Sequence, residues 1–320
     1  MPHGLYKYEM KKIVFLIAFF GLFYTNSNAQ QDPHYTQYMY NMNVINPAYA
    51  GSKESISGSL LYRQQWVGLE GAPKTASFAL HSPVGKNVGL GISVISDQIG
   101  PVKENNVYAD FSYKLNLGNN NKLLFGLKTG TTFHQVGLFS DIGDGFVQNP
   151  SDLAFGDNTN NTYFNFGAGV FYHSENYYLG VSMPNFLQTK HLSLSRDGDF
   201  YNFGSETQHY FITGGYVFQY NEFVKLKPSF MLKSAINVPL SADFSGNIML
   251  YDKFEIGATY RLEDSFGAMV NFAVTPNLRI GYAYDSIISD LRAVAPSSHE
   301  IMLLFDLNLY KKVSISPRFF

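Results

Sequence analysis

Apolar and polar residues alternate along many short segments of this chain, most clearly in its last third. In FEIGATYRL (254–262), every second residue is apolar, and the residues between are polar or glycine. Side chains of a β-strand point to opposite faces with a period of two, so one face of this segment is apolar and the other is polar. The apolar set is Phe254, Ile256, Ala258, Tyr260 and Leu262.

The alternation recurs in fourteen segments after residue 54, most of them 9 to 13 residues long. A tilted transmembrane strand needs about 9–11 residues. The pattern therefore predicts an all-β chain in which residues 55–320 form a 14-stranded antiparallel transmembrane β-barrel. The predicted strands are 55–66, 74–82, 88–96, 106–117, 122–136, 162–174, 176–186, 207–220, 223–234, 239–250, 253–262, 265–274, 278–288 and 298–309.

Charged residues fall on the polar face of the predicted strands. A Lys on the lipid-facing side at the middle of the bilayer costs about 2–4 kcal/mol, so these side chains are predicted to point into the lumen. Pro228 lies on the apolar face and cannot donate to a strand ladder, which predicts a bulge or local irregularity there. The candidate lumen residues are Asp110, Lys114, Lys225, Lys227, Lys233, Glu255 and Arg261.

The connections between the predicted strands alternate in length. Every second connection is a short turn such as YNE or TPN, whereas the others include the long segments 137–161 and 187–206. Bacterial barrels have short periplasmic turns and longer extracellular loops, so both termini are predicted to be periplasmic. The outer connections near Asn237 and Asp264 are short and depart from this pattern. A soluble β-sandwich is the alternative, but nothing in a sandwich requires loop lengths to alternate.

The N-terminus has the features of a secretory signal peptide. Lys11 and Lys12 precede an apolar run over 13–23, which is followed by a small polar stretch ending at Ala29. Residues 1–29 are therefore predicted to be removed, with the mature chain beginning at Gln30. The run is shorter than the roughly 20 residues of a transmembrane helix, although a signal anchor is the alternative. Export and the barrel together predict a location in the outer membrane.

Composition narrows the function classes further. Charged residues make up 15% of the chain, below the roughly 25% of soluble domains, while Tyr and Phe number 23 and 28. This fits a barrel, because lipid-facing and lumen-facing residues average out along each strand. The absence of cysteine excludes disulfides and thiolate metal sites. The net charge of −2 gives no support for a nucleic-acid partner.

Residues 30–54 form a distinct segment before the barrel. They are rich in Tyr, Asn and Met and lack the period of a strand. A barrel of this size has a lumen that needs filling, so the segment is predicted to pack in or under the barrel, with NPAYAG (46–51) turning the chain into the first strand. A periplasmic tail is the alternative. The candidate packing residues are Tyr38, Tyr40, Asn46, Pro47 and Tyr49.

No catalytic or cofactor motif is complete. The sequence lacks GxSxG, the HEIML run at His299 lacks the second His of a zinc protease, and the GLG run at Gly89 lacks a third glycine. We therefore predict no enzyme activity and no cofactor. The eight histidines show no metal-ligand spacing. Trp66 is predicted to belong to the outer aromatic girdle rather than to stack on a ligand.

One long outer loop carries four acidic residues that provide oxygen ligands of the kind calcium prefers. Their spacing does not match an EF-hand, and the loop is rich in Gly and Asn, so a solvated surface loop is the favoured interpretation. The four residues are Asp141, Asp144, Asp152 and Asp157.

Three runs in order resemble the PorP/SprF family of Bacteroidota: QYMYNMNVINPAYAGS (37–52), YRQQWVGLEGAPKTASFALHSP (62–83) and GLGISVISDQIGP (89–101). The strand pattern extends the resemblance to the C-terminus. One departure is Leu153 in the DLAF stretch (152–155), where the family has a proline, which affects the expected conformation of that loop.

The resemblance implies an outer-membrane protein of the type IX secretion system, linked in some members to gliding motility. It implies a partner that is a secreted cargo protein, retained at the cell surface through its C-terminal signal domain. Further implied partners are other secretion components, including a periplasmic peptidoglycan-associated protein. The alternative function is an outer-membrane channel or transporter for small or hydrophobic solutes.

The two long outer loops are the predicted cargo-contact site. They interleave apolar residues with Asp, Asn and Gly, and aromatic anchors surrounded by polar groups are typical of protein interfaces. The alternative is that these loops fold inward and cap the barrel. The candidate contact residues are Leu138, Phe139, Phe146, Phe155, Leu187, Phe200 and Phe203.

Overall fold

The computed structural model describes residues 34–137, 159–187, 190–196, 199–205, 208–235, 238–295 and 297–307. The predicted signal peptide and the four acidic residues of the first long outer loop lie outside the described residues, as do Leu138, Phe139, Phe146 and Phe155.

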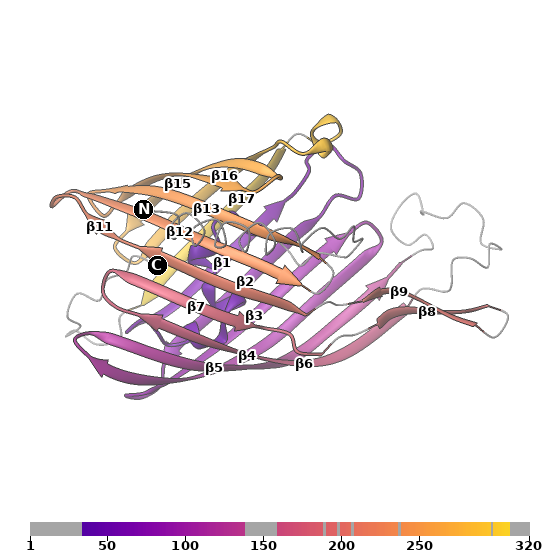
Figure 1. Cartoon of the computed structure of the whole chain (residues 1–320), viewed down its shortest axis with the longest axis horizontal. Helices are drawn as coiled ribbons and strands as arrows, with labels where there is room; N and C mark the ends of the chain where they lie inside the picture. Colours follow the sequence, from indigo (N-terminus) through magenta and orange to yellow (C-terminus); the bar gives the residue numbers. More distant parts are fainter. Residues whose placement is uncertain are drawn as a thin grey trace, which may run out of the picture.

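Strands make up most of the described chain, and the predicted strands are found within a few residues of their expected positions (Figure 1). None of the described helices is long and apolar enough to cross a membrane. The strands are β1 (Ile56–Gln64), β2 (Lys74–Pro83), β3 (Val88–Ile99), β4 (Val102–Gly118), β5 (Asn121–Val136), β6 (Thr159–His173), β7 (Tyr177–Met183), β8 (Lys190–Arg196), β9 (Asp199–Ser205), β10 (His209–Tyr216), β11 (Phe218–Gln219), β12 (Val224–Ala235), β13 (Val238–Leu250), β14 (Phe254–Arg261), β15 (Ser265–Thr275), β16 (Leu278–Ile287) and β17 (Ser297–Leu307).

The main sheet closes on itself. Each wall strand pairs antiparallel with its neighbours in the chain, β1 pairs with β17, and β10 pairs with both β7 and β12. Strands β10 and β11 keep one register against β12 and form a single wall strand interrupted at Val217. The wall therefore has fourteen strands, which confirms the predicted antiparallel barrel.

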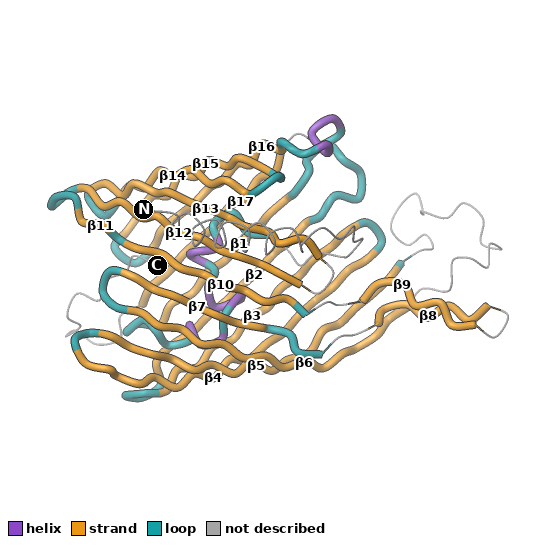
Figure 2. The backbone as a smooth tube through the Cα atoms, in the orientation of Figure 1, coloured by secondary structure: helices purple, strands orange, loops and turns teal. Residues whose placement is uncertain are grey.

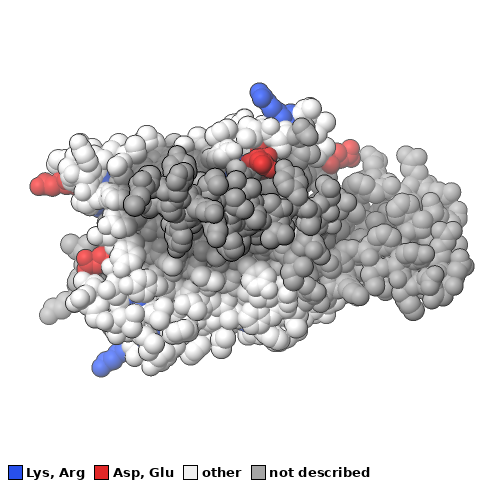
Figure 3. Space-filling view, in the orientation of Figure 1, with Lys and Arg blue, Asp and Glu red and all other residues white. Residues whose placement is uncertain are grey.

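The two faces of the wall have opposite character. Along β4, Val107 and Phe111 are exposed on the outside, whereas Tyr108 and Asp110 between them are buried in the lumen. The outer surface is uncharged over much of the described wall, and Lys, Arg, Asp and Glu lie toward the two ends (Figure 3). This is the distribution that a membrane-spanning barrel requires, because only its ends and its lumen offer charges a polar environment.

The two ends of the barrel differ in their connections. At one end, called the turn end here, β1 begins and tight turns join the strands; at the other, called the loop end, the hairpin β8–β9 extends beyond the wall (Figures 1 and 2). Asn119 and Asn120 both have positive φ in the β4–β5 turn, as do Tyr251 and Asp252 in the β13–β14 turn. Two consecutive left-handed residues match the right-handed twist of the flanking strands and allow a tight hairpin.

One expectation needs correction, and another is confirmed on one side of its strand only. The segment 187–206 was predicted as a loop, but it contains the two-stranded sheet β8–β9, because the run HLSLSR alternates like a short strand. At Pro228 the β12–β13 register continues without a shift, and the shift lies between Lys233 and Ala235. The interruption occurs opposite Pro228 in the other neighbour, between β10 and β11, since proline cannot donate to that ladder.

Candidate functional site: a filled lumen

Residues 34–52, called the lumen segment here, lie inside the barrel, and Figure 2 shows their short helices surrounded by wall strands. The helices are η1 (Tyr38–Tyr40), α2 (Met42–Ile45) and η2 (Pro47–Tyr49). Asn46 caps η2, because its side chain accepts a hydrogen bond of 2.9 Å from the Ala48 N–H, and Pro47 supplies the fixed φ of a first helical residue. Nearly every side chain of the segment is buried.

The second half of the lumen segment lies directly against wall glycines of β3, β5 and β6. A Cβ at Gly126 would be 2.1 Å from the Ala48 nitrogen, and a Cβ at Gly89 would be 2.3 Å from the Ala50 oxygen. A Cβ at Gly169 would be 2.1 Å from the Asn46 side chain. Only glycine leaves room for a second backbone to approach this closely. The three wall glycines, Gly89, Gly126 and Gly169, are together called the glycine seat below.

Hydrogen bonds fix the segment on this seat. Asn46 donates from Nδ2 to the Val170 carbonyl at 3.0 Å, and Ser182 donates to the Ile45 carbonyl at 2.9 Å. The Gly51 N–H donates to His81 Nδ1 at 3.1 Å. Ser182 and His81 thus satisfy backbone atoms of the segment that a strand or a long helix would otherwise satisfy, and a buried backbone group without a partner is costly.

Buried ion pairs hold the first half of the segment. Arg63 of β1 lies 2.8 Å from Asp285 and 3.3 Å from Glu300 and donates to the Thr36 hydroxyl at 2.7 Å. Glu300 also accepts the backbone N–H groups of Thr36 at 2.8 Å and Gln37 at 2.9 Å. Arg63, Asp285 and Glu300 are each no more than 2% exposed. This set, called the Arg63 cluster, joins the three wall strands β1, β16 and β17 to the lumen segment.

A second polar contact centres on Tyr40. Its hydroxyl donates to Glu255 and accepts from Lys227 at 2.6 Å, while Lys227 lies 3.1 Å from Glu255. Burial and the neighbouring Glu255 carboxylate raise the pKa of the Tyr40 hydroxyl well above its ordinary value. The hydroxyl therefore stays protonated and keeps its donor role.

A third contact lies between β4, β5 and α2. Lys128 is 2.9 Å from Asp110, which also accepts a hydrogen bond of 3.3 Å from the Asn43 side chain. Lys128 donates to the Asn43 carbonyl at 3.4 Å. The segment is thus joined to charged groups on both sides of the lumen.

The structure places the candidate lumen residues on the inner face of the wall. Lys114 is half-buried, and the other six are less than 10% exposed. Glu255, Lys227 and Asp110 contact the lumen segment, whereas Arg261 pairs with Asp243 at 2.6 Å and Lys225 pairs with Asp252.

The sequence analysis missed four charged residues that make the central contacts. Their positions, in phase with the polar face of their strands, were a usable signal. The four residues are Arg63, Lys128, Asp285 and Glu300.

The candidate cargo-contact residues are not brought together by the described structure. Leu187 is 41% exposed, and its backbone bonds the Asn165 side chain at 3.0 and 3.1 Å. Phe200 and Phe203 lie in β9, where they pair with Ser195 and Leu192. Trp66 follows β1 at the loop end in a left-handed conformation and is half-buried.

Among the described residues, no group of three or more His, Asp or Glu side chains has the arrangement of a metal site. The buried charges of the lumen mostly form ion pairs between wall strands, and three of these groups of charges also bond polar atoms of the lumen segment. This arrangement is suited to holding a chain in place, and the fold defines a membrane β-barrel of the outer-membrane type with a filled lumen.

The sequence profile described as type IX secretion system membrane protein PorP/SprF matches residues 27–305. The match spans most of the chain, so the protein belongs to the PorP/SprF family. This confirms the resemblance carried by the three N-terminal runs. Among curated proteins, none matches the chain.

Solved outer-membrane barrels share the fold. The Ralstonia pickettii toluene transporter TbuX is 12% identical, with 83% of this chain and 92% of that chain covered and a TM-score of 0.52. The CymD monoaromatic hydrocarbon channel is 11% identical, with 85% and 93% covered and a TM-score of 0.50. At this identity the likeness concerns the barrel fold and not the ligand.

Proposed function

We propose that this protein is a non-enzymatic outer-membrane barrel that supports type IX secretion and retains secreted cargo at the cell surface through the cargo's C-terminal signal domain. The observation that carries the proposal is the filled lumen. Retention needs a stable wall and an outer surface that binds protein, whereas diffusion needs a continuous path. The lumen segment contacts strands on both sides of the barrel, through Lys227 on β12 and Glu255 on β14 and through the glycine seat on β3, β5 and β6.

The second candidate function is a channel or transporter for small or hydrophobic solutes. The fold shared with a toluene transporter and a hydrocarbon channel favours it. In this chain, transport would require displacing a segment held by three sets of buried charged contacts. Displacing the segment breaks its hydrogen bonds to these charged wall groups, and a hydrogen bond to a charged group contributes about 1.5–3 kcal/mol, so spontaneous opening of the lumen is rare under the proposed function.

The orientation and processing of the chain form part of the proposal. Residues 1–29 act as a signal peptide, the turn end faces the periplasm, and the loop end faces the cell exterior. This orientation follows the rule that bacterial barrels keep short turns on the periplasmic side. N-terminal sequencing of the purified protein should return Gln30 first. Protease added to intact cells should cleave within 141–157 and leave the turn between β2 and β3 intact.

The loop end is the proposed cargo site. The hairpin β8–β9 extends beyond the wall there (Figure 1), and the connection 138–158 emerges from the same end, between β5 and β6. The proposed contact residues are the seven apolar residues named from the sequence, six of them on these two elements and Leu187 just before β8. A cargo domain bound at this end stays outside the membrane while the barrel anchors it.

The test is to replace residues 141–157 with a Gly-Ser segment of equal length. Barrel assembly and heat-modifiable migration should remain, while cargo escapes into the medium. The matched control replaces the exposed turn residues 84–87 at the opposite end with Gly-Ser. Full surface retention of every cargo in the loop variant would reject the loop as the binding site.

Partners of the secretion system form the finer part of the proposal. The barrel is expected to co-purify with other type IX components, including a periplasmic peptidoglycan-associated protein, and in a gliding organism its loss should also reduce motility. Pull-down from detergent-solubilised cells, followed by identification of the bound proteins, measures this. Co-purification of cargo only, with no periplasmic component, would restrict the role to retention.

A further inference from the structure

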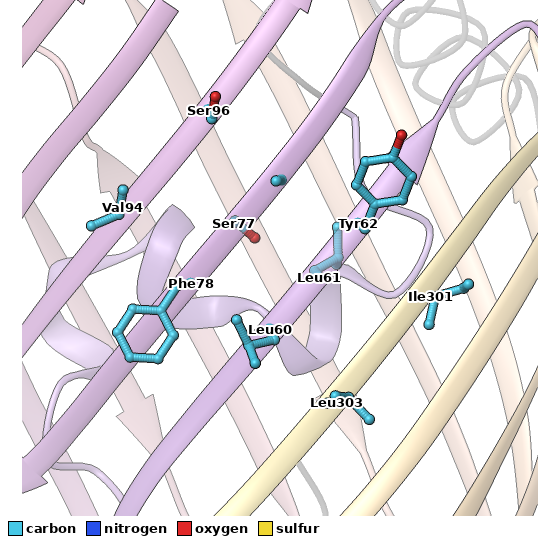
Figure 4. A pocket seen from close by; sticks show the side chains of 10 residues that line it. Leu60, Leu61, Tyr62, Ser77, Phe78, Val94, Ser96, Ile301 and Leu303 are labelled. Carbon is cyan, nitrogen blue, oxygen red and sulfur yellow. The ribbon is translucent and has the colours of Figure 1, made fainter.

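An apolar groove of about 360 Å³ lies on the outer face of the wall, across β17, β1, β2 and β3 (Figure 4). Two rows of register partners cross it. The first row is Ile301, Tyr62, Ala76 and Ser96. The second row is Leu303, Leu60, Phe78 and Val94.

The groove arises from a difference in side-chain size. In the first row, the two small residues Ala76 and Ser96 lie beside the large Tyr62. In the second row, the large Phe78 lies two residues from Ala76 on the same face of β2. Side chains therefore project little from the outer face at Ala76 and Ser96 and project further around them, which leaves a groove. Leu60, Tyr62 and Ile301 are 44%, 46% and 52% exposed, so the groove is open to the surroundings of the barrel.

The chemistry of the lining restricts what can occupy it. The ladders β1–β2, β1–β17 and β2–β3 run through this region without a register shift, so the floor offers no free backbone group to a polar ligand or an added strand. No Lys, Arg, Asp or Glu lines the groove. An occupant therefore gains only from burying apolar surface.

The groove is continuous with the lipid-facing wall. Tyr62 lies two residues before the loop-end terminus of β1, and Ala76 lies two residues after the loop-end start of β2. The groove is thus reached from the membrane leaflet at the loop end, where an aromatic ring with a hydroxyl suits the boundary between hydrocarbon and head groups. Acyl chains are the apolar groups present at high concentration on such a wall.

We propose that this groove binds one acyl chain of a membrane lipid from the leaflet at the loop end. The proposal does not depend on the proposed function, because it rests on the outer wall and not on the lumen or the loops. The chain lies over Ala76 and Ser96, between Tyr62 and Phe78. A bound lipid of this kind belongs to the first shell around the barrel but exchanges more slowly than its neighbours.

The experiment uses the full mature barrel in vesicles of palmitoyl-oleoyl phosphatidylethanolamine, followed by extraction and native mass spectrometry at increasing collisional activation. The wild type should keep one phospholipid after the other lipids have been removed. Ala76→Phe fills the groove and should lower the lipid-bound fraction about tenfold. Ala258→Phe, at an outward position on β14, is the matched control and should bind as the wild type does.

Ser96→Leu fills the groove from the neighbouring strand and should act as Ala76→Phe does, while heat-modifiable migration reports that each variant has folded. Equal retention by Ala76→Phe and the wild type would overturn the proposal, as would a wild type that keeps no lipid. Ser96→Cys provides a crosslinking site in cells. Efficient crosslinking to a protein at that position would assign the groove to a protein partner and also overturn the proposal.

Discussion

The two halves of the lumen segment are held by different physical means. Residues 34–43 are held by charge, through the Arg63 cluster and the contacts of Tyr40 and Asn43. Residues 46–51 are held by shape, with their backbone seated on wall glycines. A buried charged contact is lost when a substitution removes one of its partners. Close packing is lost when a substitution adds atoms where there is no room for them. The two halves should therefore fail under opposite kinds of substitution.

A substitution in the Arg63 cluster should cause the largest loss in the free energy of unfolding. Arg63→Met leaves Asp285 and Glu300 buried without their cation, and breaking a buried ion pair costs about 3–5 kcal/mol. Urea unfolding of the reconstituted barrel measures the change in the free energy of unfolding. The control is Arg292→Met, because Arg292 is exposed on η3 (Asp290–Ala293). Equal stability of the two variants would mean that this cluster does not hold the segment.

The glycine seat should respond to an added side chain. Gly126→Val places a Cβ against the backbone of Pro47 and Ala48, and backbone cannot turn away as a side chain can. Overpacking of this kind costs about 1–3 kcal/mol and should displace the segment. Limited proteolysis then cuts within residues 34–52.

Gly246→Val is the matched control, because a Cβ at Gly246 meets nothing within 4 Å. It should leave the lumen segment protected. Cleavage at the same rate in both variants would show that strand propensity, and not the seat, determines the response.

The Tyr40 hydroxyl should contribute less to the free energy of unfolding than the Arg63 cluster. Tyr40→Phe removes one group that bonds both Lys227 and Glu255 but leaves those two paired with each other at 3.1 Å. A hydrogen bond to a charged group contributes about 1.5–3 kcal/mol, so a loss of about 2 kcal/mol is expected on unfolding. Tyr220→Phe, at a side chain that is 76% exposed, should change nothing. A loss of similar size in both variants would contradict the assigned contact.

The cap of η2 should give the smallest effect. Asn46→Ala removes the acceptor for the Ala48 N–H and the donor to Val170, and loss of a helix cap costs about 1 kcal/mol. Hydrogen exchange at Ala48 should accelerate accordingly. Asn116→Ala, at an exposed position of β4, is the control. An unchanged exchange rate at Ala48 would show that the cap is dispensable.

The sequence predicted the wall because a period of two is local. Each strand repeats it within about ten residues, so the strand positions and the inward direction of Lys227 and Glu255 followed without knowledge of any partner. The hairpin β8–β9 was missed because two strands of seven residues are shorter than a membrane span, and the barrel already closed without them.

The contacts between the wall and the lumen segment could not be predicted from local sequence patterns. Arg63 and Glu300 are 237 residues apart and meet because β1 and β17 close the barrel. Gly126 looked like any strand glycine, since alternation gives the face of a residue but not what lies against that face. Tyr38 and Asn46 were predicted to pack in or under the barrel because residues 30–54 lack the period of a strand. Which wall groups they contact depends on how the barrel closes.

Single-channel recording in planar bilayers tests the central claim, that residues 34–52 close the lumen. The purified wild type should show no steady conductance. A variant lacking residues 34–52 should show one, because it keeps the wall and loses the segment that fills it. A large, steady conductance from the wild type would contradict the account and favour the transport function.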